Sequence, residues 1–150
     1  MTPDVNVLVA ALRPDHPHHT VANSWLESAV FAATSDATSG ASFTLMPMVI
    51  ASYLRLVTSA KIFAKPTSMK DAVAAVDKLL SALGVVLANL GAEWAGLQEL
   101  CVQKNLSGND VPDAWLAAAT SQIGEHLVTF DRALKRLLPR NQVTFLISTG

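Results

Sequence analysis

Short apolar runs alternate along the chain with longer amphipathic segments, a pattern typical of strands that alternate with helices. The short runs predict strands at residues 4–9, 43–46, 85–90, 126–129 and 142–147. Between them, apolar residues recur every three or four positions and predict helices that begin near residues 16, 47, 68, 92 and 110. This alternation implies right-handed crossovers and a largely parallel sheet, so we expect an α/β fold.

Several helix boundaries have local signals of their own. Pro47 suits the first turn of a helix, because its missing N–H would lack a partner there in any case. Ser68 with Asp71 three residues later resembles a capping box. Gly84 and Gly124 each follow an apolar periodic segment and predict its end.

The first apolar run, D-V-N-V-L-V at residues 4–9, predicts a strand that is buried on both faces. A carboxylate inside such a strand is costly to bury unless another group pairs with it. Asp4 is therefore the acid whose position asks most strongly for a functional explanation.

A second group of acids lies between residues 109 and 131. Asp110 and Asp113 open a predicted helix three residues apart, which places both side chains on one face. Asp131 lies just past the predicted strand 126–129, and the carboxyl ends of strands in an open α/β sheet face the ligand crevice. Carboxylates gathered there repel one another, and a hard cation such as Mg²⁺ relieves the repulsion. The structural alternative is that each acid only caps or begins a helix.

Composition limits the other possibilities. The chain has 150 residues, enough for one domain over residues 1–150, with 51% hydrophobic and 15% charged residues. A surface this apolar favours burial against another protein, in a homodimer or against a partner helix. A single cysteine, Cys101, and no signal peptide indicate a reducing, cytoplasmic setting, and no apolar run is long enough for a membrane span.

Charge is unevenly distributed although the net charge is only -1. Residues 37–70 and 132–150 contain Lys and Arg but no Asp or Glu. A basic rim around an acidic centre is what a metal-dependent enzyme acting on a phosphodiester needs, because the rim holds phosphates while the acids hold the metal. Solvated helix faces remain the alternative.

Three motifs in this order resemble the PIN domain, and in particular the VapC-type toxins of bacterial toxin–antitoxin pairs. They are D-V-N-V-L-V at 4–9, N-D-V-P-D-A-W-L-A-A-A at 109–119 and L-V-T-F-D-R-A-L at 127–134. The resemblance extends to D-H-P-H-H-x-x-A-x-x-W-L at 15–26 and R-L-V-T at 55–58, so it spans nearly the whole chain.

The resemblance implies a three-layer α/β/α sandwich with a mainly parallel central sheet. It also implies an endoribonuclease that depends on Mg²⁺ or Mn²⁺ and is neutralised by a cognate antitoxin protein. Asp4 matches the family's first-strand acid, Asp113 the acid of its D-A motif, and Asp131 the acid of its T-x-D motif. Asn6 and Thr129 match the polar residues that support those carboxylates.

One departure from the family pattern concerns the metal. The family usually has another acid, commonly Glu, on the second helix, and this chain has none between Asp36 and Asp71. Three possibilities stay open: Asp110 replaces that ligand, water fills its place, or the site holds a single ion. A second departure, Leu134 where an aromatic residue often follows the T-x-D acid, affects packing only.

Arg55 and Arg132 are candidates to contact the RNA phosphate and stabilise its developing charge. Two rival functions remain. The missing acid favours a catalytically depleted PIN-like module that binds RNA or protein. An Asp on a first strand also occurs in phosphotransferases that use it as a covalent nucleophile, but a lysine placed to meet the phosphoryl group is not evident here.

Overall fold

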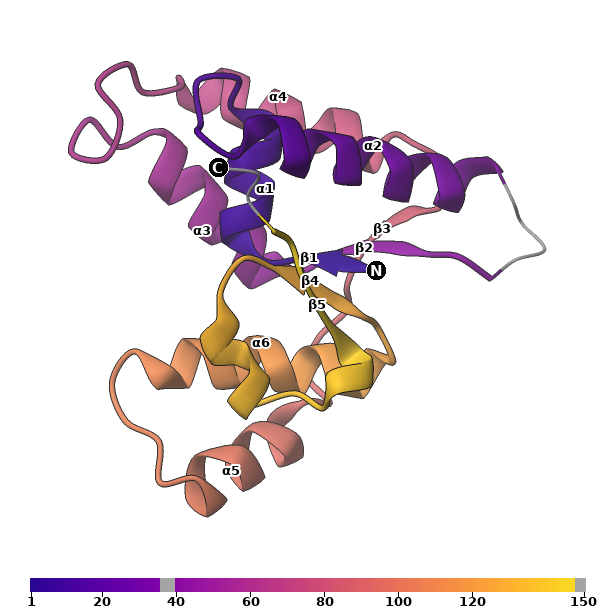
Figure 1. The fold of residues 1–150 in the computed structure, drawn as a ribbon, viewed down its shortest axis with the longest axis vertical. Helices are drawn as coiled ribbons and strands as arrows, with labels where there is room; N and C mark the ends of the chain where they lie inside the picture. Colours follow the sequence, from indigo (N-terminus) through magenta and orange to yellow (C-terminus); the bar gives the residue numbers. More distant parts are fainter. Residues whose placement is uncertain (36–39, 148–150) are drawn as a thin grey trace.

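The computed structural model describes residues 1–35 and 40–147, in which helices cover both faces of a small sheet (Figure 1). The helices are α1 (Val5–Leu12), α2 (His19–Ser35), α3 (Pro47–Val57), α4 (Met69–Leu80), α5 (Trp94–Gln103) and α6 (Asp110–Ile123). The strands are β1 (Thr2–Pro3), β2 (Phe43–Leu45), β3 (Val85–Leu87), β4 (Leu127–Thr129) and β5 (Val143–Phe145). Two short 3₁₀ helices, η1 (Arg132–Arg136) and η2 (Arg140–Gln142), connect β4 to β5.

The strands pair in parallel throughout the described part of the chain. One set has the order β1-β4-β5 and the other pairs β2 with β3. The backbone N–H of Thr44 donates to the carbonyl of Met1 at 2.9 Å, which joins β2 to β1. The spatial order is therefore β3-β2-β1-β4-β5, and the expected parallel sheet is confirmed.

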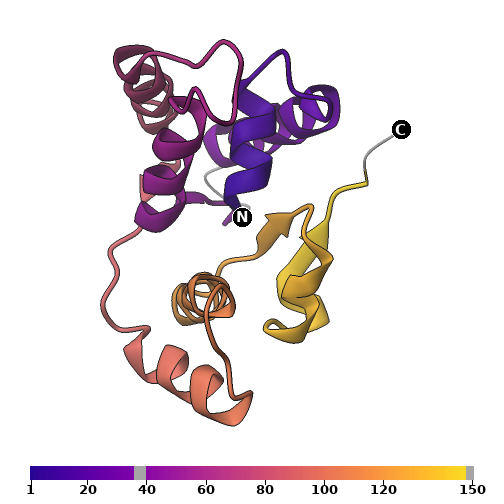
Figure 2. The ribbon, with the colours of Figure 1, turned by 90° about the vertical axis from the view of Figure 1, so that its left-hand side faces the viewer.

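The helices form two layers. Figure 1 shows α1, α2, α3 and α4 on one side of the sheet and α5, α6 and the η segments on the other. The view turned by 90° shows α5 at the outer edge of its layer, with α6 between it and the strands (Figure 2). This arrangement confirms the predicted α/β/α sandwich.

The strand expected at residues 4–9 is wrong, because β1 ends at Pro3 and residues from Val5 onward form α1. A short continuous apolar run has the same appearance in a buried strand and in a helix buried on most sides, and α1 is the second case. Five consecutive residues of α1, Val7 to Ala11, are buried. The helix packs between the sheet and its neighbours α2 and α3, so it has almost no exposed face.

Three other boundaries follow their local signals, whereas α4 ends at Leu80, four residues before Gly84, because residues 81–84 form a turn, and α2 begins at His19 rather than near residue 16. Pro47 begins α3, and the hydroxyl of Ser68 accepts from the backbone N–H of Asp71 at 3.1 Å. Gly124 ends α6 in the left-handed region with a φ of 70°, a conformation that glycine adopts without a Cβ penalty. The remaining strands are three residues each, shorter than expected.

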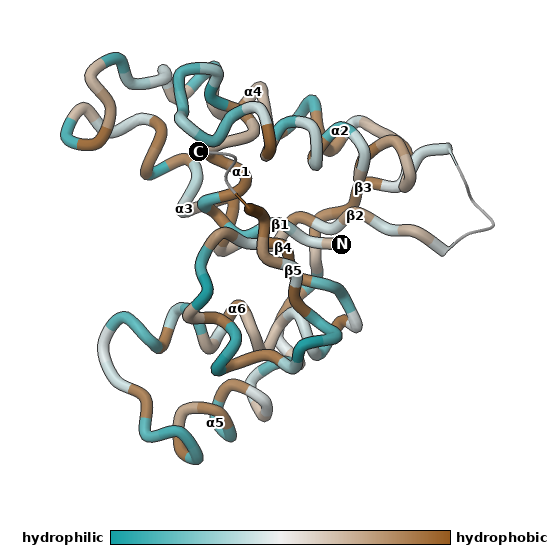
Figure 3. The backbone as a smooth tube through the Cα atoms, in the orientation of Figure 1, coloured by the Kyte–Doolittle hydropathy of each residue, from teal (hydrophilic) through white to brown (hydrophobic). Residues whose placement is uncertain are grey.

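The hydrophobic core lies where α1 meets the strands. Coloured by hydropathy, the chain is hydrophobic along α1 and β3, while hydrophilic segments concentrate in peripheral loops (Figure 3).

Helix α5 differs from the other α-helices, because none of its ten residues is buried and Trp94 is 62% exposed. No helix in residues 1–35 and 40–147 has the length and apolarity to cross a membrane.

Candidate active site

Asp4 lies at the carboxyl end of β1 and acts as the N-cap of α1. The residue is buried, with 8% of its surface exposed to solvent. One carboxylate oxygen, Oδ1, accepts from the backbone N–H of Val5 at 2.6 Å, and Oδ2 accepts from the hydroxyl of Thr129 at 2.7 Å. These two bonds offset part of the cost of burying the carboxylate. Asp4 is thus placed by a helix cap and by the neighbouring strand β4.

Thr129 connects three of the predicted site residues through one hydroxyl. Besides donating to Asp4, its Oγ1 accepts from the backbone N–H of Asp131 at 2.9 Å and from Nδ2 of Asn6 at 3.4 Å. The side-chain amide oxygen of Asn6, Oδ1, in turn accepts from the backbone N–H of Phe130 at 3.2 Å. Asn6 and Thr129 therefore hold the end of β4 against the start of α1.

Asp131 and Asp113 reach the same region from different elements. Asp131 caps η1, with its Oδ1 accepting from the backbone N–H of Ala133 at 2.9 Å. Asp113 lies in the first turn of α6 and is partly exposed. Burial raises the pKa of Asp113, and the negative charges of Asp131 and Asp110 raise it further.

The pKa of Asp4 shows that the three acids form one electrostatic group. Burial raises this pKa most, the hydrogen bonds from Thr129 and Val5 lower it, and the charges of Asp113 and Asp131 raise it again. Mutual repulsion across 127 residues of sequence requires that the three carboxylates lie near one another in space. None of the three forms an ion pair with a described Lys or Arg side chain.

A cavity of about 330 Å³ opens beside Asp4 and Asp113, between α3 and α6. Ser52 of α3 is a further polar residue at its wall, and sequence reasoning did not assign it to the site. Its position on the polar face of the predicted helix was the available signal. The remaining lining residues are mostly apolar: Val5, Met48, Val49, Leu97, Val111, Pro112, Trp115 and Leu116. The lining includes no lysine, which counts against Asp4 as a phosphotransferase nucleophile.

Glu93 holds one wall of this cavity and was also missed. Its Oε1 accepts from the indole N–H of Trp115 at 2.9 Å, and its Oε2 accepts from the backbone N–H of Gly91 at 2.6 Å. These hydrogen bonds lower the pKa of Glu93, chiefly through Trp115. Glu93 thereby ties the chain before α5 to the first turns of α6.

The predicted basic residues and Asp110 lie around the acids rather than among them. Arg136 donates from Nη2 to Oδ1 of Asp110 at 3.4 Å, so Asp110 is partly neutralised and does not line the cavity. Arg55 is exposed on α3, three residues after Ser52 and therefore on a neighbouring part of the helix surface. Arg132 directly follows Asp131, and its guanidinium carbon lies 5.8 Å from the centre of the Phe145 ring.

The donor set fits a hydrated Mg²⁺ better than a dehydrated ion enclosed by protein. Within residues 1–35 and 40–147, no three His, Cys, Asp or Glu side chains are arranged to hold an ion among themselves. Mg²⁺ typically keeps several waters and binds through one or two carboxylates together with substrate phosphate. Asp4, Asp113 and Asp131 supply hard oxygen ligands that form no ion pair with a described Lys or Arg side chain, which is the chemistry such an ion prefers.

Comparison with known proteins identifies the family of this chain. The family model of the PIN domain matches residues 1–137. The chain belongs to the PIN-domain family. Its match to the PIN model includes all three acids, which extend from β1 to the end of β4.

Among PIN-domain proteins, VapC ribonucleases are close relatives of this chain. Ribonuclease VapC31 of Mycobacterium tuberculosis is 35% identical over 136 residues, which is 89% of each protein. Ribonuclease VapC43 of the same species is 35% identical over 134 residues, covering 89% of this chain and 86% of that protein. The crystal structure of VapBC2 from Rickettsia felis bound to a DNA fragment from their promoter has a chain with a TM-score of 0.62. That chain shares 18% identity with this one, and the match covers 97% of this chain and 98% of that chain, so it supports the fold alone.

Proposed function

We propose that this PIN-domain protein is a metal-dependent endoribonuclease that acts as the toxin of a toxin–antitoxin pair. The observation that carries the proposal is the gathering of Asp4, Asp113 and Asp131, none of which forms an ion pair with a described Lys or Arg side chain. Arg136, which pairs with Asp110, offsets only part of the charge on Asp113. Keeping such a group charged is unfavourable unless a bound ion compensates it. The names of the VapC relatives supply the reaction class, cleavage of RNA.

Each acid has a distinct part in holding Mg²⁺, with Mn²⁺ as the substitute ion. Asp4 is fixed in direction, since both of its oxygens accept a hydrogen bond and each keeps a further lone pair for an ion or its water. Asp131 is oriented by the 3₁₀ helix that it caps, and Asp113 projects from the first turn of α6. Thr129 and Asn6 fix the positions of Asp4 and Asp131 relative to each other through their hydrogen bonds. When bound, the ion would polarise the scissile phosphate and lower the pKa of the attacking water.

Residues around the acids would position the RNA. Arg55 and Arg132 are exposed on opposite flanks, on α3 and η1, where each can meet a phosphate oxygen and offset charge that develops during cleavage. Asp110 would act indirectly, by holding Arg136 beside α6 and by raising the pKa of Asp113. Ser52 offers a hydroxyl at the cavity wall on α3, the face where this chain has no acid.

A cleavage assay on the purified protein tests the proposal. We expect the wild type to cut single-stranded RNA in Mg²⁺ or Mn²⁺ and to lose the activity in EDTA. Asp113→Asn should lose it in either metal, because the amide removes a ligand charge while keeping the shape. Asp77→Asn, the same change at an exposed position of α4, is the matched control and should cut normally. Undiminished cleavage in EDTA would refute the metal mechanism.

The toxin role requires a partner that blocks the site. A hollow of about 450 Å³ between α2 and α4, with an apolar side that includes Leu26, Val30 and Leu79, has the character of a groove for an amphipathic antitoxin helix. Large apolar side chains are also exposed elsewhere, including Phe31 at 70% and Trp94 at 62%, which supports association of two copies as well. Co-expression with the protein encoded directly upstream should yield a stable complex that no longer cuts RNA. Light scattering on the isolated chain should report a homodimer.

A catalytically depleted RNA- or protein-binding module is the second candidate. It is favoured by one observation, the absence of any acid on α3, whose residues at the cavity wall are Met48, Val49 and Ser52. Such a module would bind no metal at Asp4. Measuring Mn²⁺ affinity with and without the Asp4 carboxylate therefore separates the two functions.

A further inference from the structure

A second, basic hollow lies on the other flank of the acids. It has a volume of about 620 Å³ and lies between η1, η2 and β5. Its lining combines three cationic side chains with an aromatic ring: Arg132, Lys135, Leu138, Arg140, Val143, Thr144 and Phe145. This set, the η1–β5 hollow, shares no residue with the cavity beside Asp4 and Asp113.

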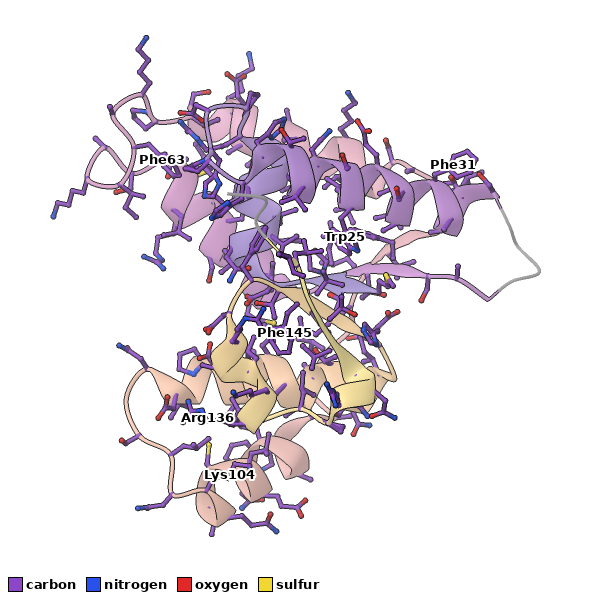
Figure 4. The ribbon with its side chains drawn as sticks, viewed as in Figure 1. Trp25, Phe31, Phe63, Lys104, Arg136 and Phe145 are labelled. Atoms are coloured by element: carbon purple, nitrogen blue, oxygen red, sulfur yellow. The ribbon has the colours of Figure 1, made fainter. Side chains whose placement is uncertain are left out.

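The geometry of η1 explains why cations gather in this hollow. A 3₁₀ helix has three residues per turn, so residues i and i+3 lie one above the other. Arg132 and Lys135 therefore share the face of η1 that lines the hollow, whereas Arg136 lies on another face and binds Asp110. Figure 4 shows Arg136 beside α6 and Phe145 closer to the sheet. Arg140 joins the first two from the start of η2.

The positive charge of the hollow is not neutralised locally. Residues 132–150 contain no Asp or Glu. Among the ion pairs of residues 1–35 and 40–147, none includes Arg132, Lys135 or Arg140. Three like charges around one depression repel one another, and an anionic ligand relieves the repulsion.

The aromatic ring distinguishes nucleic acid from other anions. Phe145 is partly buried in β5 and lines the same hollow as the three cations, with the guanidinium of Arg132 at 5.8 Å from its centre. A cationic groove with an aromatic platform is the arrangement that binds single strands, because phosphates meet the charges while an unpaired base stacks on the ring. Bases in a duplex are already stacked and paired, so they cannot use such a platform.

We propose that the η1–β5 hollow is a subsite for single-stranded RNA, which holds the nucleotides on one side of the cleavage point. The proposal rests on the proposed ribonuclease function for its choice of RNA. Arg132 lines the hollow and directly follows Asp131. An RNA strand bound in the hollow would therefore lie next to Asp131. The subsite makes the protein selective for unpaired RNA long enough to reach both the acids and Phe145.

Binding measured without cleavage tests the subsite. Labelled oligouridylate is titrated in EDTA with protein carrying Asp113→Asn, over a range of salt concentrations. Replacing Lys135 and Arg140 together by Gln should lower the slope of log affinity against log salt by about 1.4, since each single-strand phosphate contact contributes roughly 0.7. The matched control is the pair Lys61→Gln and Lys70→Gln, which removes the same charge from exposed positions near α4 and should leave the slope within error.

The ring is tested separately. Phe145→Leu keeps an apolar side chain for packing against the core and removes the stacking surface, so it should weaken binding of the single strand by about fivefold or more. The same variant should not change the weaker binding of a duplex of equal length.

Three results would overturn the subsite: a slope change no larger than that of the control pair, unchanged affinity in Phe145→Leu, or equal affinity of the wild type for duplex and single strand. The cleavage assay is independent of these outcomes. Failure of metal-dependent cleavage with a normal binding result would refute the ribonuclease and leave the RNA subsite standing.

Discussion

Replacing Thr129 by Val removes the hydroxyl on which Asp4 and Asp131 both depend, while nearly keeping the side-chain shape. Thr129 is fully buried, and its Oγ1 donates to Oδ2 of Asp4 at 2.7 Å. A hydrogen bond to a charged group contributes about 1.5–3 kcal/mol. Thr129→Ser keeps the hydroxyl and loses only a methyl group, at a cost of about 1 kcal/mol. At neutral pH the Val variant should therefore be less stable than the Ser variant.

The pH dependence separates this bond from simple packing. Burial raises the native pKa of Asp4 and the Thr129 hydrogen bond lowers it, so losing Thr129 should raise that pKa further. The extra cost falls on the ionised carboxylate. It should be fully present above the native pKa of the variant and fade as the pH falls from that pKa to the lower native pKa of the wild type. At acid pH only a neutral hydrogen bond, about 1 kcal/mol, is lost.

Urea denaturation of the three proteins at neutral and at mildly acid pH measures these differences as free energies of unfolding. The account requires that the gap between Thr129→Val and wild type narrows on acidification, and that Thr129→Ser shows a smaller gap at neutral pH. Equal losses for Val and Ser, or a Val gap that does not change with pH, would show that Thr129 does not stabilise the charged form of Asp4.

Three further predictions address the site and the fold. Because burial and neighbouring acids raise the pKa of Asp113, its ionised form destabilises the metal-free protein, so Asp113→Asn should raise the melting temperature in EDTA near neutral pH. This gain should vanish as the pH falls through the native pKa, and a loss at neutral pH would contradict the account. Trp115→Phe leaves the Glu93 carboxylate with one hydrogen bond fewer and should lower the free energy of unfolding, measured in urea, by about 1–3 kcal/mol. An unchanged urea midpoint would show that Glu93 does not stabilise this wall of the cavity. Gly84→Ala should destabilise far more than Gly124→Ala, since both have positive φ but only the Cβ at Gly84 would meet a backbone oxygen, at 2.2 Å. Thermal unfolding of the pair checks this order, and similar losses would refute it.

The sequence was most informative where a candidate site residue also marks the start of a helix or the end of a strand. Asp113 and Asp131 could be placed because one opens a helix with clear start and stop residues and the other follows a strand. Their convergence with Asp4 then followed from the parallel sheet, in which β1 and β4 are neighbours. Asp4 was expected at the start of a buried strand, but it follows the carboxyl end of β1 and caps α1, because the apolar run after it is a helix buried on nearly all sides.

The parts that could not be predicted depend on how separate helices face one another. Ser52 reaches the cavity only because α3 lies opposite α6, and a polar helix face does not reveal what it faces. Glu93 precedes α5, and its bond to Trp115 spans 22 residues that include a loop. Phe145 and Lys135 line one hollow because the segment between η1 and β5, which includes η2, folds back on η1. Periodicity describes one element at a time, so such contacts lie outside its reach.

We propose that Asp4, Asp113 and Asp131 hold one metal ion, some of them through bound water rather than directly. Calorimetric titration of Mn²⁺ into the RNA-free protein tests it most directly, with Asp113→Asn as the site variant and Asp77→Asn as the matched control. The account predicts one saturable site in the wild type and in Asp77→Asn, and an affinity at least tenfold weaker in Asp113→Asn. Equal Mn²⁺ binding by all three proteins, or none by the wild type, would contradict it.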